Sequence, residues 1–255
     1  YNIYGNNHGN VCIFTCRTYL LMKTRKFREG INFTEEGIKF EIGKKEFLIW
    51  LFYIYALKSR MQIFTGDIDG AIDTLDKADY IITVALSAPS ILGEFMLAKF
   101  HLNLNLLEDA LKKTDINNIK KYTSETGPVA KRTLKVSSKC AMIRTEALKF
   151  MGVYSWLINK PAASIKWWLK AIEAGEKIHD RLELSRVYFE IGKRLLEKPV
   201  TSKYESRVKK AAALLKNKTR LTPEQYLDKA ETMFREMDLQ WDLEQVEMVR
   251  GSQVN

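Results

Sequence analysis

The chain has 255 residues, of which 46% are hydrophobic and 28% charged, a balance typical of a globular protein and unlike that of a disordered or fibrous one. Its three cysteines are too few for a disulfide framework, and its longest apolar run, residues 47–57, is shorter than the roughly 20 residues that a membrane-spanning helix needs. We therefore expect a cytoplasmic protein with no membrane partner, and the formal net charge of +10 leaves acidic partners open.

The two ends of the chain differ in character. The first ten residues, YNIYGNNHGN, begin with Tyr and have neither the basic start nor the apolar stretch of a signal peptide. The last stretch, from residue 238, combines a helical pattern with a polar end, as a capping helix does. We expect an N-terminus that was cut from a longer chain and a natural C-terminus near residue 255.

Helical spacing of apolar residues runs through nearly every segment, whereas the alternation typical of strands is hard to find. Small residues recur 12 positions apart, as they would where two helices of a pair approach closely. The predicted pairs are marked by Thr18 and Gly30, Ser59 and Ala71, Ala98 and Ala110, and Gly152 and Ser164. The sequence therefore predicts an all-α chain of helix pairs.

Three segments of the first half have specific predictions. The apolar run 47–57 predicts a buried helix. The stretch TGDIDGAID at 65–73 lacks the third ligand and the closing Glu of a calcium loop, so it predicts a turn and N-cap that open the helix containing Ala71. We expect a polar, basic loop around 115–138, because it would account for the long interval between Ala110 and Ser164.

Two adjacent tryptophans stand in the stretch MGVYSWLINKPAASIKWWLKAIEAG at 151–175. Pro161 predicts the start of a helix after the break at 159–161. Trp168 shares one stripe of that helix with Ser164 and Ala171, and Trp167 lies about 100° around the helix. Because a helix in a stacked array buries two flanks, we expect both tryptophans to pack rather than to bind a ligand.

A fifth helix pair is predicted at 183–197 and 222–237. Gly192 takes the small position of its first helix, and Thr222 with Gln225 predicts a capping box at the start of the second, which contains Ala230 and Phe234. The residues between them, at about 198–221, form an apolar stripe on a basic background, which predicts an inserted amphipathic helix.

Two windows hold most of the positive charge. Residues 120–139 and 198–220 are both rich in Lys and Arg, with one Glu each. The inserted helix offers a contact for an anion or an acidic partner, at Arg207, Lys209, Lys210, Lys216 and Lys218. We favour a solubilising loop and helix over a nucleic-acid site, because neither window interleaves aromatic residues for stacking on single strands.

The pattern of 151–175, with Gly152, Ser164, Trp168 and Ala171 in its signature places, resembles the tetratricopeptide repeat, a helix-turn-helix unit of about 34 residues. A narrower resemblance rests on residues 4–30, 183–197 and 226–247. These are similar to the helical repeats that follow the P-loop ATPase in large bacterial signalling proteins with a class III cyclase or kinase domain. The resemblance implies a regulatory or partner-binding part of such a protein, with no catalytic residue.

No catalytic or cofactor motif is found. The chain has no P-loop, no dinucleotide fingerprint, no H-E-x-x-H and no G-x-S-x-G. His8, Cys12 and Cys16 are spaced four apart, but they would extend about 12 Å along a helix, too far to share one zinc ion. We expect buried thiols, and we expect paired charges such as Glu183 with Arg186 to lie on solvated helix faces.

The sequence thus predicts one domain over residues 1–255, a right-handed solenoid of about five helix pairs that resembles tetratricopeptide repeats. We expect a non-enzymatic, cofactor-free module that binds a protein or peptide, which could be another domain of its own parent chain. The alternative is binding of nucleic acid or an anionic surface through the basic insertion. An enzyme ranks last, because no constellation of catalytic residues was found.

Overall fold

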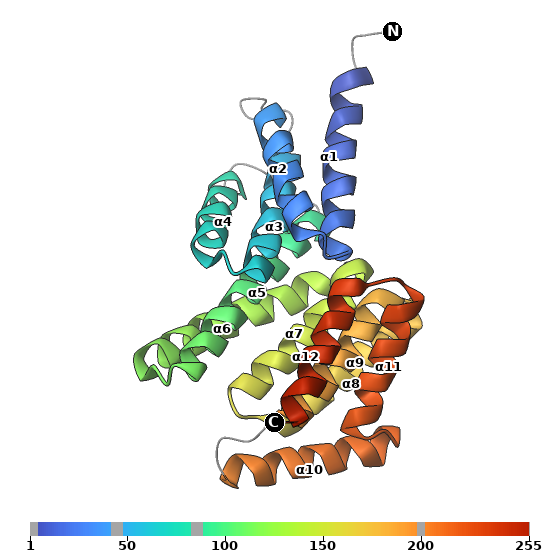
Figure 1. Cartoon of the computed structure of the whole chain (residues 1–255). Helices are drawn as coiled ribbons and strands as arrows, with labels where there is room; N and C mark the ends of the chain where they lie inside the picture. The colour runs from blue at the N-terminus through green and yellow to red at the C-terminus, as the bar shows by residue number, and fades with distance from the viewer. Residues whose placement is uncertain (1–4, 42–47, 83–88, 198–201, 255) are drawn as a thin grey trace. The chain divides into compact units, whose positions relative to one another are not determined.

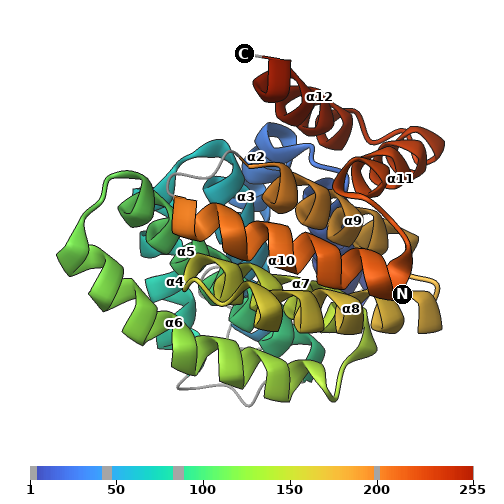
Figure 2. The same ribbon diagram turned by 90° about the horizontal axis from the view of Figure 1, so that it is seen from below.

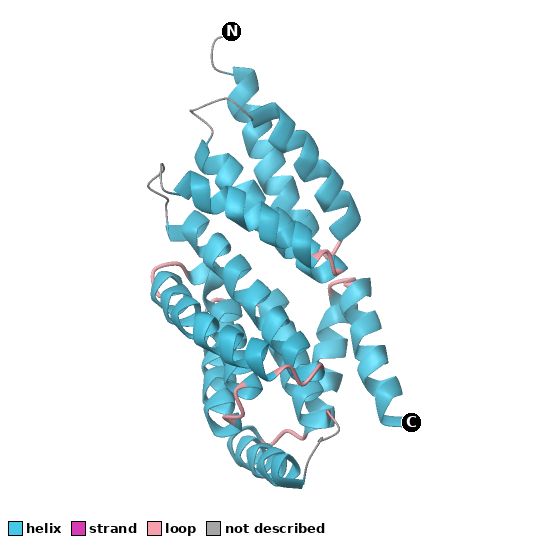
Figure 3. Cartoon of the chain, turned by 90° about the vertical axis from the view of Figure 1, so that its left-hand side faces the viewer, coloured by secondary structure: helices cyan, strands magenta, loops and turns pink. Residues whose placement is uncertain are grey.

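The structure, a computed structural model, describes residues 5–41, 48–82, 89–197 and 202–254. In these ranges all regular secondary structure is helical, so the chain is all-α there, as predicted (Figure 3). The elements are α1 (Gly5–Lys23), α2 (Phe27–Glu41), α3 (Leu48–Thr65), α4 (Ile68–Ile82), α5 (Pro89–Lys112), α6 (Ile116–Ser137), the 3₁₀-helix η2 (Ala141–Ile143), α7 (Arg144–Leu157), α8 (Pro161–Lys177), α9 (Arg181–Leu196), α10 (Ser202–Thr219), α11 (Pro223–Glu236) and α12 (Gln240–Val254).

The chain divides into two compact units, unit 1 with residues 1–143 and unit 2 with residues 144–255 (Figure 1). In unit 1, α1 packs on α2, α3 on α4, and α5 on α6, while α3 also contacts α1 and α5. In unit 2, α7 packs on α8, and α9 packs on α11. The sequence predicts one continuous domain, and whether each unit folds alone is a question for an experiment on fragments.

The same turn ends six of the helices. One residue has a positive φ, its N–H donates to the carbonyl three residues back, and the following N–H donates to the carbonyl five residues back. This is the Schellman motif, which satisfies the last carbonyls of a helix. In every case the next helix begins two residues after the residue with positive φ. These residues are Arg25, Gly66, Thr114, Asn159, His179 and Asp238.

The repeated turn explains the 12-residue spacing. Ser59 and Ala71 lie seven positions before and five positions after Gly66, and Gly152 and Ser164 have the same relation to Asn159. A constant turn returns the second helix along the first in a constant register. Residues 12 apart therefore face each other within a pair.

The third predicted pair is wrong. Ala98 and Ala110 both lie on α5, and the residues that stand seven before and five after Thr114 are Leu107 and Ile119. The positions that face each other across this turn therefore hold large residues. The 12-residue spacing of Ala98 and Ala110 falls within a single helix.

The predicted loop at 115–138 is also wrong, because it is the helix α6. Pro128 lies inside α6, on its exposed side. The buried side carries small and mostly polar residues, a weak hydrophobic signal; they are Thr126, Ala130, Thr133 and Ser137. Thr133 Oγ1 donates to the Met96 carbonyl on α5, at 3.2 Å.

The predictions for the apolar run 48–57 and for the stretch 65–73 hold; residue 47 lies outside the described residues. The apolar run forms most of α3, which is buried along much of its length and lies at the centre of an apolar cluster with α4 and α5. Asp67 opens α4, since its Oδ1 accepts a hydrogen bond from the Gly70 N–H at 3.0 Å. The stretch is thus a helix start rather than a calcium loop.

In unit 2, α10 is inserted between the paired helices α9 and α11, and it packs on α8 (Figure 2). It lies inside the range predicted for the insertion, and Val208, Ala211 and Leu215 form its buried stripe. Thr222 and Gln225 make both bonds of the predicted capping box at the start of α11.

Candidate functional site

The tryptophan pair belongs mainly to the packing of unit 2. Trp168 is fully buried, and its ring lies against Gly152 on α7 and 5.7 Å from the ring of Trp156. The Ser164 hydroxyl donates to the Gly152 carbonyl at 2.6 Å, which fixes α8 on α7. Trp167 is half-buried, with the Lys170 ammonium 4.8 Å from its ring centroid.

The other residues expected to pack are buried. Gly30 faces Met61 on α3, and Gly192 faces Leu227 on α11; in both places a methyl group would clash. The remaining buried positions are Ser59, Ala71, Ala98, Ala110, Ala171, Ala230 and Phe234. Their burial is consistent with a role in packing one helix against another.

A buried ionic cluster joins three helices of unit 2. It consists of Glu146 and Lys149 on α7, Glu183 and Arg186 on α9, and Asp242 on α12. Lys149 Nζ lies 3.0 Å from Glu183 Oε2, and Arg186 Nη1 lies 3.2 Å from Glu183 Oε1. Arg186 also donates to both carboxylate oxygens of Asp242, at 3.1 and 2.9 Å. The cluster therefore ties α7, α9 and α12 to one another.

The cluster corrects the prediction that Glu183 and Arg186 lie on a solvated face, because both are buried. Burial lowers the pKa of the Arg186 guanidinium, but the carboxylates of Glu183 and Asp242 outweigh that effect, so its pKa is raised. A sequence signal existed, since Leu184, Val187 and Ile191 already make one apolar flank of α9. If α9 is buried on two flanks and its apolar residues occupy one, then the second buried flank contains charged residues.

Unit 1 contains a related ion pair. Arg60 Nη1 on α3 lies 2.6 Å from Glu94 Oε2 on α5, and both side chains are buried. Burial also raises the pKa of the nearby Tyr53 phenol, and the Glu94 charge raises it further. Ionic contacts thus link neighbouring helices in both units. In both places the charged side chains are buried among packed neighbours.

The pKa shifts and side-chain positions of the described residues bear on acid–base and metal chemistry. Burial raises the pKa of the Tyr188 phenol to about 12, so the phenol is neutral at pH 7. Its oxygen accepts a hydrogen bond from Lys229 Nζ at 2.9 Å, which holds the side chain in place. In the part of the chain that the structure describes, no three His, Cys, Asp or Glu side chains are placed to hold a metal ion. Cys12 and Cys16 are exposed on α1, which makes the prediction of buried thiols wrong.

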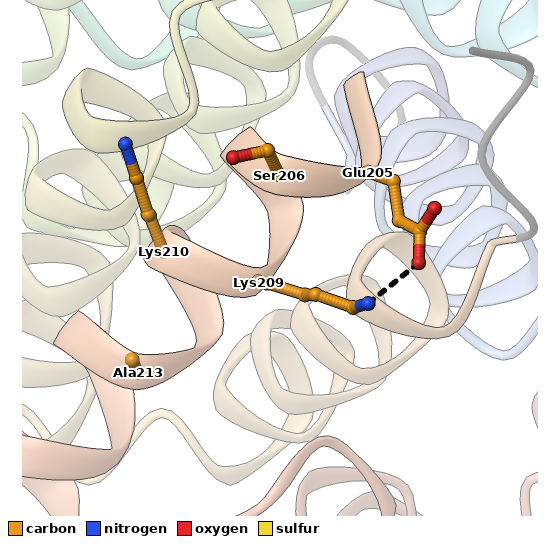
Figure 4. Close-up of a pocket in the computed structure, with 5 residues that line it drawn as sticks. All are labelled: Glu205, Ser206, Lys209, Lys210 and Ala213. Atoms are coloured by element: carbon orange, nitrogen blue, oxygen red, sulfur yellow. Dashed lines mark ion pairs between the residues drawn. The ribbon is translucent and has the colours of Figure 1, made fainter. Parts of the chain in front are cut away.

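The basic residues of α10 surround an open hollow of about 510 Å³, lined from that one helix by Glu205, Ser206, Lys209, Lys210 and Ala213. Figure 4 shows Lys209 turned toward Glu205, 2.6 Å away, while Lys210 extends in another direction. At 100° per residue, Lys209, Lys210, Lys216 and Lys218 spread over about 200° of the helix circumference. They do not form one stripe. The Arg207 side chain lies outside the described residues.

A second pocket, of about 300 Å³, is lined by Leu196 of α9, Glu224 and Leu227 of α11, and Arg250 of α12. Arg250 Nη2 lies 2.7 Å from both Asp228 Oδ1 and Glu231 Oε2, so it bridges α12 and α11 beside the pocket. The lining combines two leucines with one acidic and one basic side chain.

Comparison with known proteins adds no relative: no family model matches the chain, and no curated protein matches it either. Among the helices described, none combines the length and the apolar character needed to cross a bilayer.

Proposed function

We propose that the chain is a helical-repeat module of the tetratricopeptide type that binds a protein or peptide and performs no catalysis. The observation that carries the proposal is the identical turn at six helix ends, with the next helix always starting two residues later. Repetition of one supersecondary unit is the basis of right-handed helical solenoids, whose usual role is protein recognition. About five helix pairs would form this solenoid.

The pocket lined by Leu196, Leu227, Glu224 and Arg250 is the proposed contact for one side chain of the partner. Its leucines would bury an aliphatic group, while Glu224 and Arg250 would orient neighbouring polar groups. The packing residues position the helices that bear this pocket. Gly192, for example, lets α11 approach α9 closely, because a Cβ atom there would lie 2.7 Å from Leu227, which lines the pocket.

The resemblance to bacterial signalling proteins supports the further proposal that this module is a regulatory, cytoplasmic part of a multidomain protein, whose other domains would be among its partners. Binding of anionic surfaces through α10 is a weaker alternative, because its lysines are spread around the helix and Lys209 is already paired with Glu205.

The test is affinity capture from cell extract followed by measurement of direct binding to each captured protein by calorimetry. The substitution Glu224→Lys reverses one charge of the pocket. It should lower the affinity for a true partner by about tenfold, because a charge of the wrong sign then faces the bound group. Glu173→Lys, on the exposed side of α8, makes the same charge change away from the pocket and should leave the affinity unaltered. The proposal fails if no captured protein binds directly, or if both variants bind as tightly as the wild type.

A further inference from the structure

The outer side of α6 carries a basic stripe, defined by Lys120, Lys121, Lys131, Arg132 and Lys135, all of them exposed. At 100° per residue, their positions relative to Lys120 are 0°, 100°, 20°, 120° and 60°. All five thus lie within about one third of the circumference, opposite the face that packs on α5. The stripe is about 22 Å long, at 1.5 Å per residue.

The charges of the stripe are not neutralised within the chain. In the ranges that the structure describes, none of the five side chains forms an ion pair, although many other exposed lysines do, such as Lys77 with Asp73 and Lys113 with Asp109. The only carboxylate on α6 is Glu125, at the edge of the stripe, and it pairs with none of them. Like charges gathered on one surface create a positive potential that attracts an anionic partner.

The composition of the stripe favours a phosphate backbone over a protein. Protein interfaces are depleted in Lys and enriched in aromatic residues and Arg, whereas this face has four lysines, one arginine, and only Ser124 and Pro128 between its two clusters of charge. Contacts to phosphate need nothing beyond such point charges. Tyr122, whose ring centroid lies 5.3 Å from Lys121 Nζ, is the one aromatic residue of α6. A single ring beside five cations disfavours single strands, which are held by stacking of successive bases.

We propose that the basic stripe of α6 binds the sugar-phosphate backbone of double-stranded nucleic acid without sequence preference. The rod-like helix presents cations along both edges of its outer face, so it can contact phosphates of both strands across a groove. The inference is independent of the pocket and of the proposed function. It also differs from the sequence-based expectation that 120–139 is a solubilising loop.

The experiment measures binding of the whole chain to a labelled 21-base-pair duplex by fluorescence anisotropy between about 50 and 200 mM salt. Five phosphate contacts predict a slope of log K against log salt of about −4.5, or a loss of roughly 500-fold over this range. The variant Lys131→Gln/Arg132→Gln/Lys135→Gln removes three contacts and should reduce the slope to about −1.8. Duplexes of different sequence should bind with similar affinity.

The matched control is Lys210→Gln/Lys216→Gln/Lys218→Gln on α10, which removes the same net charge from three exposed lysines and should keep the slope of the wild type. Circular dichroism checks that both triple variants keep their helix content. The proposal is overturned by no binding at about 100 μM protein in low salt, or by equal losses in the two variants. It is also overturned if poly-glutamate or phosphatidylserine vesicles bind the stripe as tightly as the duplex.

Discussion

At Gly152 the backbone of α7 lies directly against the ring of Trp168. A Cβ atom at this position would stand 2.2 Å from Nε1 and 2.3 Å from Cδ1 of the indole, which is rigid and fully buried. We expect Gly152→Ala to reduce the free energy of unfolding by about 1–3 kcal/mol, because the ring must move within a packed core. Urea denaturation followed by circular dichroism measures this change.

The control for this substitution is Gly9→Ala on α1, where an added Cβ meets no atom within 4 Å. Alanine favours a helix over glycine by about 1 kcal/mol, so Gly9→Ala should be neutral or slightly stabilising. If Gly152→Ala also stabilised the chain, helix propensity would outweigh the contact with Trp168, and the tryptophan would not limit the approach of the two helices.

Single residues also set the limit of prediction from sequence. Gly66 is a recognisable end of a helix, but the equivalent turns at Arg25, Thr114 and His179 use residues that seldom adopt a positive φ. Their side chains give no sequence signal that predicts the turn. The register that the turn imposes was nevertheless visible at Gly152 and Ser164, because there the contact between helices requires small residues.

At the scale of the helices, the ionic cluster decides how α12 is attached to α9. Asp242 accepts two hydrogen bonds from Arg186, and both side chains are buried. We expect Asp242→Ala to cost about 3 kcal/mol of unfolding free energy, since it removes the carboxylate that accepts two hydrogen bonds from the buried Arg186 guanidinium. Hydrogen exchange should show faster exchange of the α12 amides in this variant.

The double variant Arg186→Met/Asp242→Leu separates the ionic contribution from packing. Replacing a buried ion pair with apolar residues of similar volume is often neutral or stabilising, so we expect it to recover most of the stability lost in Asp242→Ala. Asp228→Ala, which removes an exposed partner of Arg250, should change stability by less than about 1 kcal/mol. A double variant as unstable as Asp242→Ala would show that the charges themselves hold α12.

Helices with an aliphatic buried face could be predicted from the sequence, whereas a helix with a polar buried face could not. The run at 47–57 and the start at Pro161 were correct, because apolar spacing and proline act locally. α6 was missed because Thr126, Thr133 and Ser137 bury a helix face without aliphatic side chains. The ionic cluster was missed because Lys149, Glu183 and Asp242 are far apart in sequence, and only tertiary packing shows that they are buried together.

At the scale of the whole molecule, the chain combines one repeated turn with two compact units. Each unit has its own apolar core and its own buried ionic contacts, Arg60 with Glu94 in unit 1 and the ionic cluster in unit 2. The units contain 143 and 112 residues, which lies within the usual size of a domain.

We therefore predict that fragments 1–143 and 144–255 each fold alone. Each should show a helical circular dichroism spectrum and a cooperative urea transition, and the two m-values should sum to about that of the intact chain, because m scales with the surface exposed on unfolding. Gly152→Ala should lower the transition midpoint of fragment 144–255. If either fragment lacked a cooperative transition, the result would favour the single continuous domain that the sequence predicts. In such a domain, residues 1–143 and 144–255 would depend on each other for stability.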